Sequence, residues 1–128
     1  MTLTNSVLPQ NLKLVILFGS QARGSAGTES DTDVAALSDH ALSLAERSVL
    51  IKRLALELNA PEDKVDLVDL WAAPPLLQHH ISEEGKLLYG KPFDFLRFRV
   101  LAWKRYQNTA KFRRARHETL KNYVTGNR

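Results

Sequence analysis

A short glycine-containing turn has the clearest chemical potential in this chain. The apolar run from Leu14 to Phe18 is rich in strand-forming residues and leads directly into Gly19 and Ser20. Glycine allows the backbone to approach a charged ligand closely, and such a turn offers backbone N–H groups and a hydroxyl. We therefore interpret the Gly19-Ser20 turn as a phosphate cradle.

Two closely spaced aspartates follow the turn. Asp31 and Asp33 stand at the start of a second strand-like run that ends near Leu37. Residues two apart on a strand point to the same face of the sheet, so both carboxylates can bind one ligand. Carboxylate oxygens are hard ligands that suit Mg²⁺. The pair predicts a magnesium site, although an isolated pair of this kind is also common in solvated turns.

A third strand-like run, from Lys64 to Leu70, contains Asp66 and Asp69. A carboxylate inside an apolar strand is unfavourable unless it is compensated, which suggests a function. Residues three apart on a strand face opposite sides, so only one of the two can join a site with Asp31 and Asp33.

The order of these features resembles a known signature. A Gly-Ser turn, ten further residues, Asp-x-Asp and a later strand acid are similar to the DNA polymerase beta-like nucleotidyltransferase superfamily. The form Gly-Ser-x-Ala-Arg-Gly with Ser-Asp-x-Asp resembles its minimal branch, the MNT domains, over about residues 14–70. The resemblance implies a transferase that uses a nucleoside triphosphate and two Mg²⁺ ions.

The resemblance also implies the role of each residue. In nucleotidyl transfer a hydroxyl attacks the α-phosphate and pyrophosphate leaves, and two cations can clamp the incoming and departing oxygens. The family's third acid lies between apolar residues, which fits Asp66 better than Asp69; Asp69 would then reach solvent near the strand's end. The implied triphosphate ligands are Gly19 and Ser20, and the implied catalytic and metal-binding residues are Asp31, Asp33 and Asp66.

Arg23 lies one short turn beyond Ser20 and is a candidate partner for the β- or γ-phosphate. An ion pair with Glu29 or Asp31 that shapes the loop is an equally good interpretation. Residues 25–30 are small and polar, as expected of a loop that folds over a ligand.

Length and composition predict one small intracellular domain. The chain has 128 residues, of which 44% are apolar and 25% are charged, and it has no cysteine. It has no apolar stretch near 18 residues and no N-terminal leader pattern, so disulfides, Cys-ligated zinc, secretion and a membrane span lack support. We expect a cytoplasmic protein.

The remaining pattern predicts an α/β fold. Apolar residues at helical spacing over 41–59 predict a helix that Pro61 ends. A short helix from Pro75 to about Glu84 and a short strand over 86–89 follow. We expect a small mixed β-sheet with flanking helices, the polymerase beta-like nucleotidyltransferase fold, with the acids at one edge of the sheet.

Two adjacent histidines, His79 and His80, fall on the short helix. Adjacent side chains on a helix point about 100° apart and cannot hold one metal ion together. We interpret them as surface or partner-contact residues.

The C-terminal part is strongly basic. Residues 97–128 contain ten Lys and Arg against one acid, whereas residues 1–96 contain eight against thirteen acids. Pro92 is expected to open a long helix whose apolar stripe packs on the domain or on another protein. The predicted division is a nucleotidyltransferase core over 1–91 and a basic helical arm over 92–128. The stripe consists of Phe93, Leu96, Val100, Trp103 and Tyr106 or Gln107.

The basic arm could bind RNA, dock on an acidic protein, or be a solvated helix face. The resemblance favours a protein, because MNT domains are commonly the antitoxin of a pair whose toxin is a helical HEPN ribonuclease. It implies that the chain transfers AMP from ATP to a hydroxyl of the HEPN toxin and so neutralises it. The alternatives are a non-catalytic antitoxin that acts by steric binding and an RNA-directed nucleotidyltransferase.

Overall fold

The structure is a computed structural model that describes residues 11–24 and 31–125. Its elements in chain order are β1 (Leu12–Phe18), α1 (Gly19–Arg23), β2 (Thr32–Ser38), α2 (Leu44–Glu57), the 3-10 turn η2 (Glu62–Lys64), β3 (Val65–Asp69), α3 (Pro75–Glu84), β4 (Lys86–Tyr89) and α4 (Pro92–Thr125). The strands form one sheet in the order β3-β2-β1-β4. β2 and β3 run parallel, and the other neighbouring strands run antiparallel.

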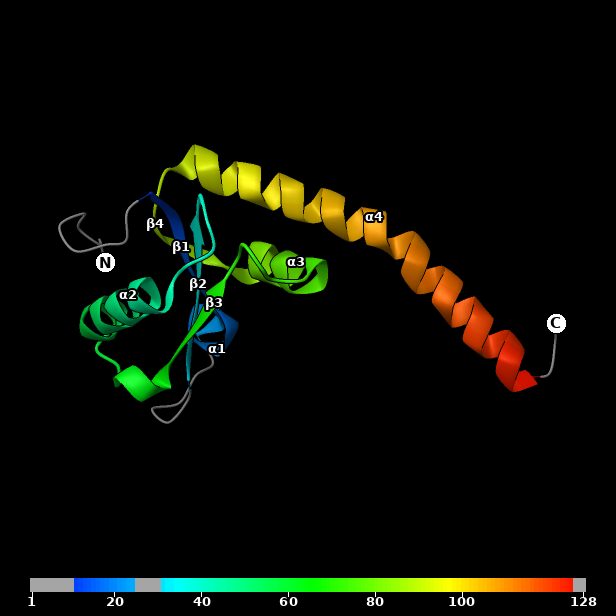
Figure 1. Cartoon of the computed structure of the whole chain (residues 1–128), viewed down its shortest axis with the longest axis horizontal. Coiled ribbons are helices and arrows are strands. Elements are labelled where there is room, and N and C mark those ends of the chain that lie inside the picture. The colour runs from blue at the N-terminus through cyan, green and yellow to red at the C-terminus, as the bar shows by residue number, and fades with distance from the viewer. Residues whose placement is uncertain (1–10, 25–30, 126–128) are drawn as a thin grey trace.

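Helices cover both faces of the sheet, because the central strands β1 and β2 are apolar at most positions (Figure 1). On one face, Leu50 and Leu54 of α2 are fully buried against the sheet. On the other face, Ile81 of α3 and Phe98 of α4 form a second buried cluster. The molecule is therefore a three-layer α/β structure, and the predicted fold class is confirmed.

The predicted elements over 41–59, 75–84 and 86–89 are present, with the first helix observed over 44–57. The turn after β1 differs from the expectation, because Gly19 opens the five-residue helix α1. Among the described residues, no helix combines the length and the apolarity that a membrane crossing requires.

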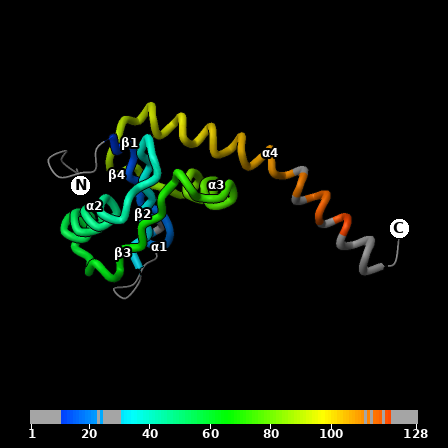
Figure 2. Tube along the Cα trace, viewed as in Figure 1, coloured from blue at the N-terminus to red at the C-terminus, as the bar shows by residue number. Residues whose placement is uncertain are grey.

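The helix α4 begins at Pro92 as predicted and continues for 34 residues. Its first part packs on the core through Phe98 and Ala102, and its later part extends past α3, away from the sheet (Figure 2). Most of the predicted stripe does not pack on the domain, although its last member, Tyr106, stacks on His79 of α3. Its members Phe93, Leu96, Val100 and Trp103 are 70%, 56%, 50% and 54% exposed.

Candidate active site

The predicted phosphate cradle is the junction of β1 and α1. Phe18 ends the strand in an extended conformation, and Gly19 opens the helix at a φ of +71°. This left-handed region strains any residue that carries a side chain. Ser20 follows in the first turn and is half-buried. The sharp change of direction between strand and helix thus depends on the glycine.

Gly19 also lies against Asp33, the predicted acid on β2. Phe18 is the register partner of Asp33 in the antiparallel pair of β1 and β2. A Cβ atom at Gly19 would overlap the Asp33 carboxylate at Oδ2. Only glycine lets this carboxylate lie over the backbone of the turn, so cradle and acid are packed against each other.

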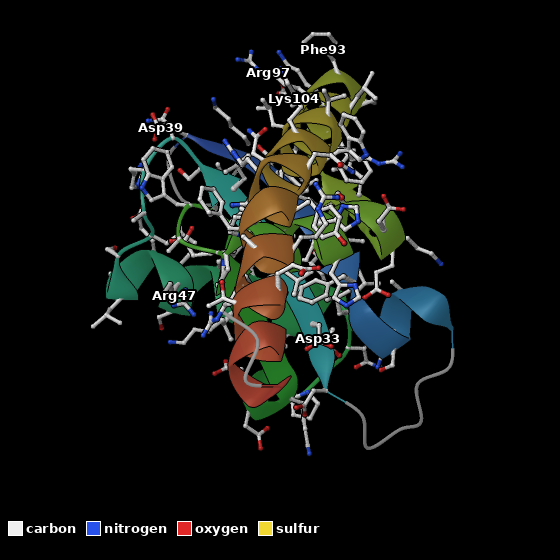
Figure 3. All side chains as sticks on the ribbon, turned by 90° about the vertical axis from the view of Figure 1, so that its right-hand side faces the viewer. Asp33, Asp39, Arg47, Phe93, Arg97 and Lys104 are labelled. Atoms are coloured by element: carbon white, nitrogen blue, oxygen red, sulfur yellow. The ribbon has the colours of Figure 1, made fainter. Side chains whose placement is uncertain are left out.

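Two of the predicted acids lie side by side. Asp33 on β2 is the register partner of Asp66 on the parallel strand β3, and directly paired residues point to the same face of a sheet. That face is the one covered by α3 and α4, since Ala35 and Val68 belong to its cluster. Asp33 is half-buried, whereas Asp66 is exposed. Figure 3 shows Asp33 at the end of β2 that lies beside α1.

Asp69 lies on the opposite face, as its separation of three residues from Asp66 requires. Its Oδ2 accepts a hydrogen bond from the N–H of Leu42 at 2.8 Å, and its Oδ1 accepts one from the N–H of Trp71 at 3.0 Å. Asp69 is half-buried at the end of the strand, and its carboxylate has backbone partners that the sequence did not indicate. This carboxylate ties the segment before α2 to the turn after β3.

The third acid of the predicted set, Asp31, is exposed and directly precedes β2. Within the described residues, no group of three or more His, Cys, Asp or Glu side chains is arranged to hold a metal ion. Asp33 and Asp66 nevertheless fit Mg²⁺ by chemistry, because they offer hard oxygen ligands on one face.

The sequence analysis missed Glu84, the last residue of α3. Its Oε1 accepts a hydrogen bond from the backbone N–H of Gly19 at 3.2 Å, across 65 positions of the chain. An N–H of the predicted phosphate cradle is therefore bound to a carboxylate. No local pattern could have revealed this contact, because it depends on how α3 packs beside the end of β1.

Two further predicted positions have different outcomes. Arg23 is the last residue of α1, and its side chain lies outside the described part of the structure, as does the loop over 25–30. His79 stacks on Tyr106 of α4 with ring centroids 4.0 Å apart at 12°. The surface role expected for this histidine is wrong, because it belongs to the contact between α3 and α4, whereas His80 is exposed.

A charged cluster lies at the other end of β2, where Figure 3 shows Asp39. His40 Nδ1 is 2.6 Å from Asp39 Oδ1, and its Nε2 is 3.0 Å from both carboxylate oxygens of Glu46. The hydrogen bond to Asp39, and then the one to Glu46, raise the pKa of His40. The hydrogen bond from the Ser43 backbone, and then the one from His40, lower the pKa of Glu46. The cluster stabilises the start of α2.

A cavity of about 680 Å³ lies between the first turns of α4 and the sheet, and its lining includes Lys13, Trp71 and Arg105. None of the predicted site residues lines it. We therefore place the candidate active site at the Gly19–Asp33–Asp66 edge and not in this cavity.

Comparison with known proteins gives the family. The profile of the polymerase beta nucleotidyltransferase family matches residues 4–94. The protein adenylyltransferase MntA of Shewanella oneidensis is 36% identical over 104 residues, which cover 81% of this chain and 73% of the relative. MntA of Aphanizomenon flos-aquae is 31% identical over 125 residues, which cover 88% and 81%. The chain belongs to the polymerase beta nucleotidyltransferase family.

Solved structures agree with this assignment. A toxin–antitoxin structure with AMP-PNP superimposes with a TM-score of 0.74 at 33% identity, and the match covers 90% of both chains. The structure of a tri-AMPylated Shewanella oneidensis HEPN toxin in complex with its MNT antitoxin superimposes with a TM-score of 0.67 at 31% identity, covering 88% of this chain and 86% of the other. The family and fold that the sequence motifs predicted are confirmed.

Proposed function

We propose that this chain transfers the AMP part of ATP to a hydroxyl of a HEPN toxin and thereby neutralises the toxin. The proposal is supported above all by the pairing of Asp33 with Asp66 beside the Gly19 turn. The similarity to MntA adenylyltransferases, and to a complex that contains an AMPylated HEPN toxin, supports AMP and the toxin as the transferred group and the acceptor.

In the proposed site, Gly19 and Ser20 hold the triphosphate through backbone N–H groups and a hydroxyl. Asp31, Asp33 and Asp66 would hold Mg²⁺, which supplies positive charge where negative charge develops on the phosphate oxygens. The acceptor oxygen forms a bond to the α-phosphorus, and the bond to pyrophosphate breaks.

The acceptor hydroxyl must lose its proton in this reaction. We assign the proton to the carboxylate of Asp66, because this side chain is exposed to an incoming partner. The half-buried Asp33 lies against Gly19 and is better placed to fix the phosphate end of the site.

The test separates transfer from simple binding. Wild-type chain with ATP, Mg²⁺ and toxin should add mass to the toxin in steps of one AMP, and the toxin should stay inactive after the chain is removed. The double variant Asp31→Asn with Asp33→Asn should fold and bind the toxin but add no AMP, because the remaining carboxylate cannot neutralise the cations. Full protection of cells by this variant would overturn transfer as the route of neutralisation and favour steric binding.

A further inference from the structure

The outer side of α4 carries an apolar row that nothing in the described structure covers. Its members stand three, four and three positions apart, which places them on one side of a helix. We call this row the outer stripe: Phe93, Leu96, Val100 and Trp103, each at least 50% exposed. Four large apolar side chains together on a surface helix indicate an interaction site.

The outer stripe is not the side of α4 that builds the core. Phe95, Phe98 and Ala102 face the sheet and belong to or pack on its buried cluster. At 100° per residue, the centres of the two rows lie about 150° apart around the helix axis. Packing on the domain therefore cannot explain the outer stripe, and Figure 3 shows Phe93 projecting at the outer edge of the molecule.

The outer stripe borders a groove between α3 and α4. This groove has a volume of about 320 Å³, and Leu96, Val100 and Trp103 line it together with Ser82 and Glu83 of α3. A groove between two helices with apolar anchors at this spacing suits the apolar ridge of a partner helix.

Charge decides between the possible occupants. Eight Lys and Arg and no acid stand between positions 95 and 117 of α4. Arg99 lines the groove on the α4 side, opposite Glu83 of α3. At 100° per residue, Arg97 and Lys104 lie on the other side of the outer stripe from Arg99. A second copy of the chain would place cations against cations, which is unfavourable, whereas a partner with acidic borders is complementary. The two aromatic members, Phe93 and Trp103, stand at the ends of the outer stripe, and its centre, Leu96 and Val100, offers no ring on which successive bases of RNA could stack.

The groove also lies next to the reaction site. Glu83 lines the groove, and the following residue, Glu84, accepts the hydrogen bond from Gly19 in the cradle. A protein docked in the groove is thereby held beside the candidate active site, where its hydroxyl must arrive.

We propose that the outer stripe and the groove form the docking surface for the protein that accepts AMP, and that this partner presents an apolar helix ridge bordered by acidic side chains. The inference rests on the proposed function, because it takes the acceptor to be the HEPN toxin. It assigns docking to residues 93–103 and not to the basic end of α4.

The experiment measures binding of the full chain to the HEPN toxin that is encoded in the same genome, with the two proteins co-expressed. Leu96→Ala combined with Val100→Ala should weaken binding by about 30-fold or more, as truncation at an interface centre does. Trp103→Ala should weaken it independently. Phe112→Ala is the matched control, because Phe112 is 75% exposed on the same helix and lies about 180° from Trp103 around the axis. It should stay within about threefold of wild type.

Binding of ATP with Mg²⁺ should be unchanged in every variant, since the altered side chains are exposed and none of them belongs to the Gly19, Asp33 and Asp66 site. If the double variant lost ATP binding, its core would be disturbed, and the toxin affinity of Trp103→Ala alone would then decide whether the outer stripe is the docking surface. Toxin binding at wild-type affinity in Trp103→Ala and the double variant, or a larger loss in Phe112→Ala, would overturn the proposal. Stripe-dependent self-association of the chain alone, or stripe-dependent binding of a single-stranded RNA, would overturn it in favour of those occupants.

Measurements of toxin binding and AMP transfer on the same variants distinguish a failure of this inference from a failure of the proposed function. If the stripe variants bind the toxin normally and AMP is still transferred, the docking surface is wrong and the function stands. If wild type binds through the stripe but transfers no AMP, the function is wrong and the docking surface stands. If both are correct, the stripe variants should raise the toxin concentration needed for transfer without lowering the rate at saturation.

Discussion

Asp66 and Asp69 allow a matched test, because they lie three residues apart on β3 and the same isosteric change can be made in each. Asp69 accepts two backbone hydrogen bonds, from Leu42 and Trp71. Asparagine has one acceptor oxygen and one donor NH₂, so Asp69→Asn can keep only one of these bonds and leaves the other N–H facing a donor. A lost hydrogen bond to a charged group costs roughly 1 to 3 kcal/mol, and water can reach the exposed N–H of Trp71.

For a chain of this size, 1 kcal/mol corresponds to about 3 to 6 °C in Tm. We therefore expect Asp69→Asn to lower Tm by at least about 3 °C while the folded protein still transfers AMP. Asp66→Asn should behave in the opposite way. Its side chain is exposed, so the free energy of unfolding should change by less than about 0.5 kcal/mol. The rate of AMP transfer should fall by about 10²- to 10⁴-fold if Asp66 accepts the acceptor's proton.

Thermal unfolding and a mass-based AMP transfer assay on the same samples provide both quantities. The reasoning would be refuted if Asp69→Asn kept its Tm and lost transfer while Asp66→Asn transferred at the wild-type rate. That result would make Asp69 the third acid of the site.

Three further predictions concern the cradle and the charged cluster. Gly19→Ala should lose AMP transfer, because its methyl would overlap Asp33. Gly24→Ala is the control, because it has the same backbone strain, at a φ of +73°, but its methyl would meet open space. Both variants should lose about 1 to 2 kcal/mol of stability in urea unfolding, and only Gly19→Ala should lose transfer. Glu84→Gln should tighten ATP binding roughly fivefold in a titration, since about 1 kcal/mol of repulsion between the carboxylate and the triphosphate is removed. Glu83→Gln is the control, because Glu83 is exposed and does not contact the cradle N–H. Unchanged ATP affinity in Glu84→Gln would count against the idea that Glu84 and the triphosphate compete for the N–H of Gly19. The pKa of His40 is raised above 6.5, so its stabilising effect is present below pH 6.5 and is lost as the pH rises through the raised pKa. The difference in unfolding free energy between wild type and His40→Asn should therefore shrink as the pH rises above 6.5, and a difference that does not change with pH would contradict the assignment.

The parts of the site that the sequence predicted well are those set by local geometry. The strand before Gly19 and the position of Asp33 at the start of β2 follow from apolar runs and from the spacing of motifs. The opposite faces of Asp66 and Asp69 follow from the two-residue period of a strand. These rules hold within a single element, so no knowledge of packing was needed.

The parts that failed depend on how elements pack. The contact between Glu84 and Gly19 joins positions 65 apart, and no pattern links them. In α4, two rows have helical spacing, one through Phe93 and Trp103 and the other through Phe98 and Ala102. Periodicity fits both rows, and the row with more large side chains is the exposed one. The turn at Gly90, with a φ of +120°, sets the direction in which α4 leaves the sheet and thus the row that faces the core.

The order of the strands gives a physical reason for the roles proposed for the acids. The cradle stands at the end of β1, Asp33 on the neighbouring β2, and Asp66 on β3, which is the edge strand. Neighbouring strands lie about 4.8 Å apart, so these three groups form a row across the sheet. A triphosphate held at β1 would place its α-phosphate towards Asp33, and the acceptor hydroxyl would approach from the side of the edge strand β3, where Asp66 is exposed. The leaving group, the reacting phosphate and the acceptor would then be aligned in the order that an in-line transfer requires.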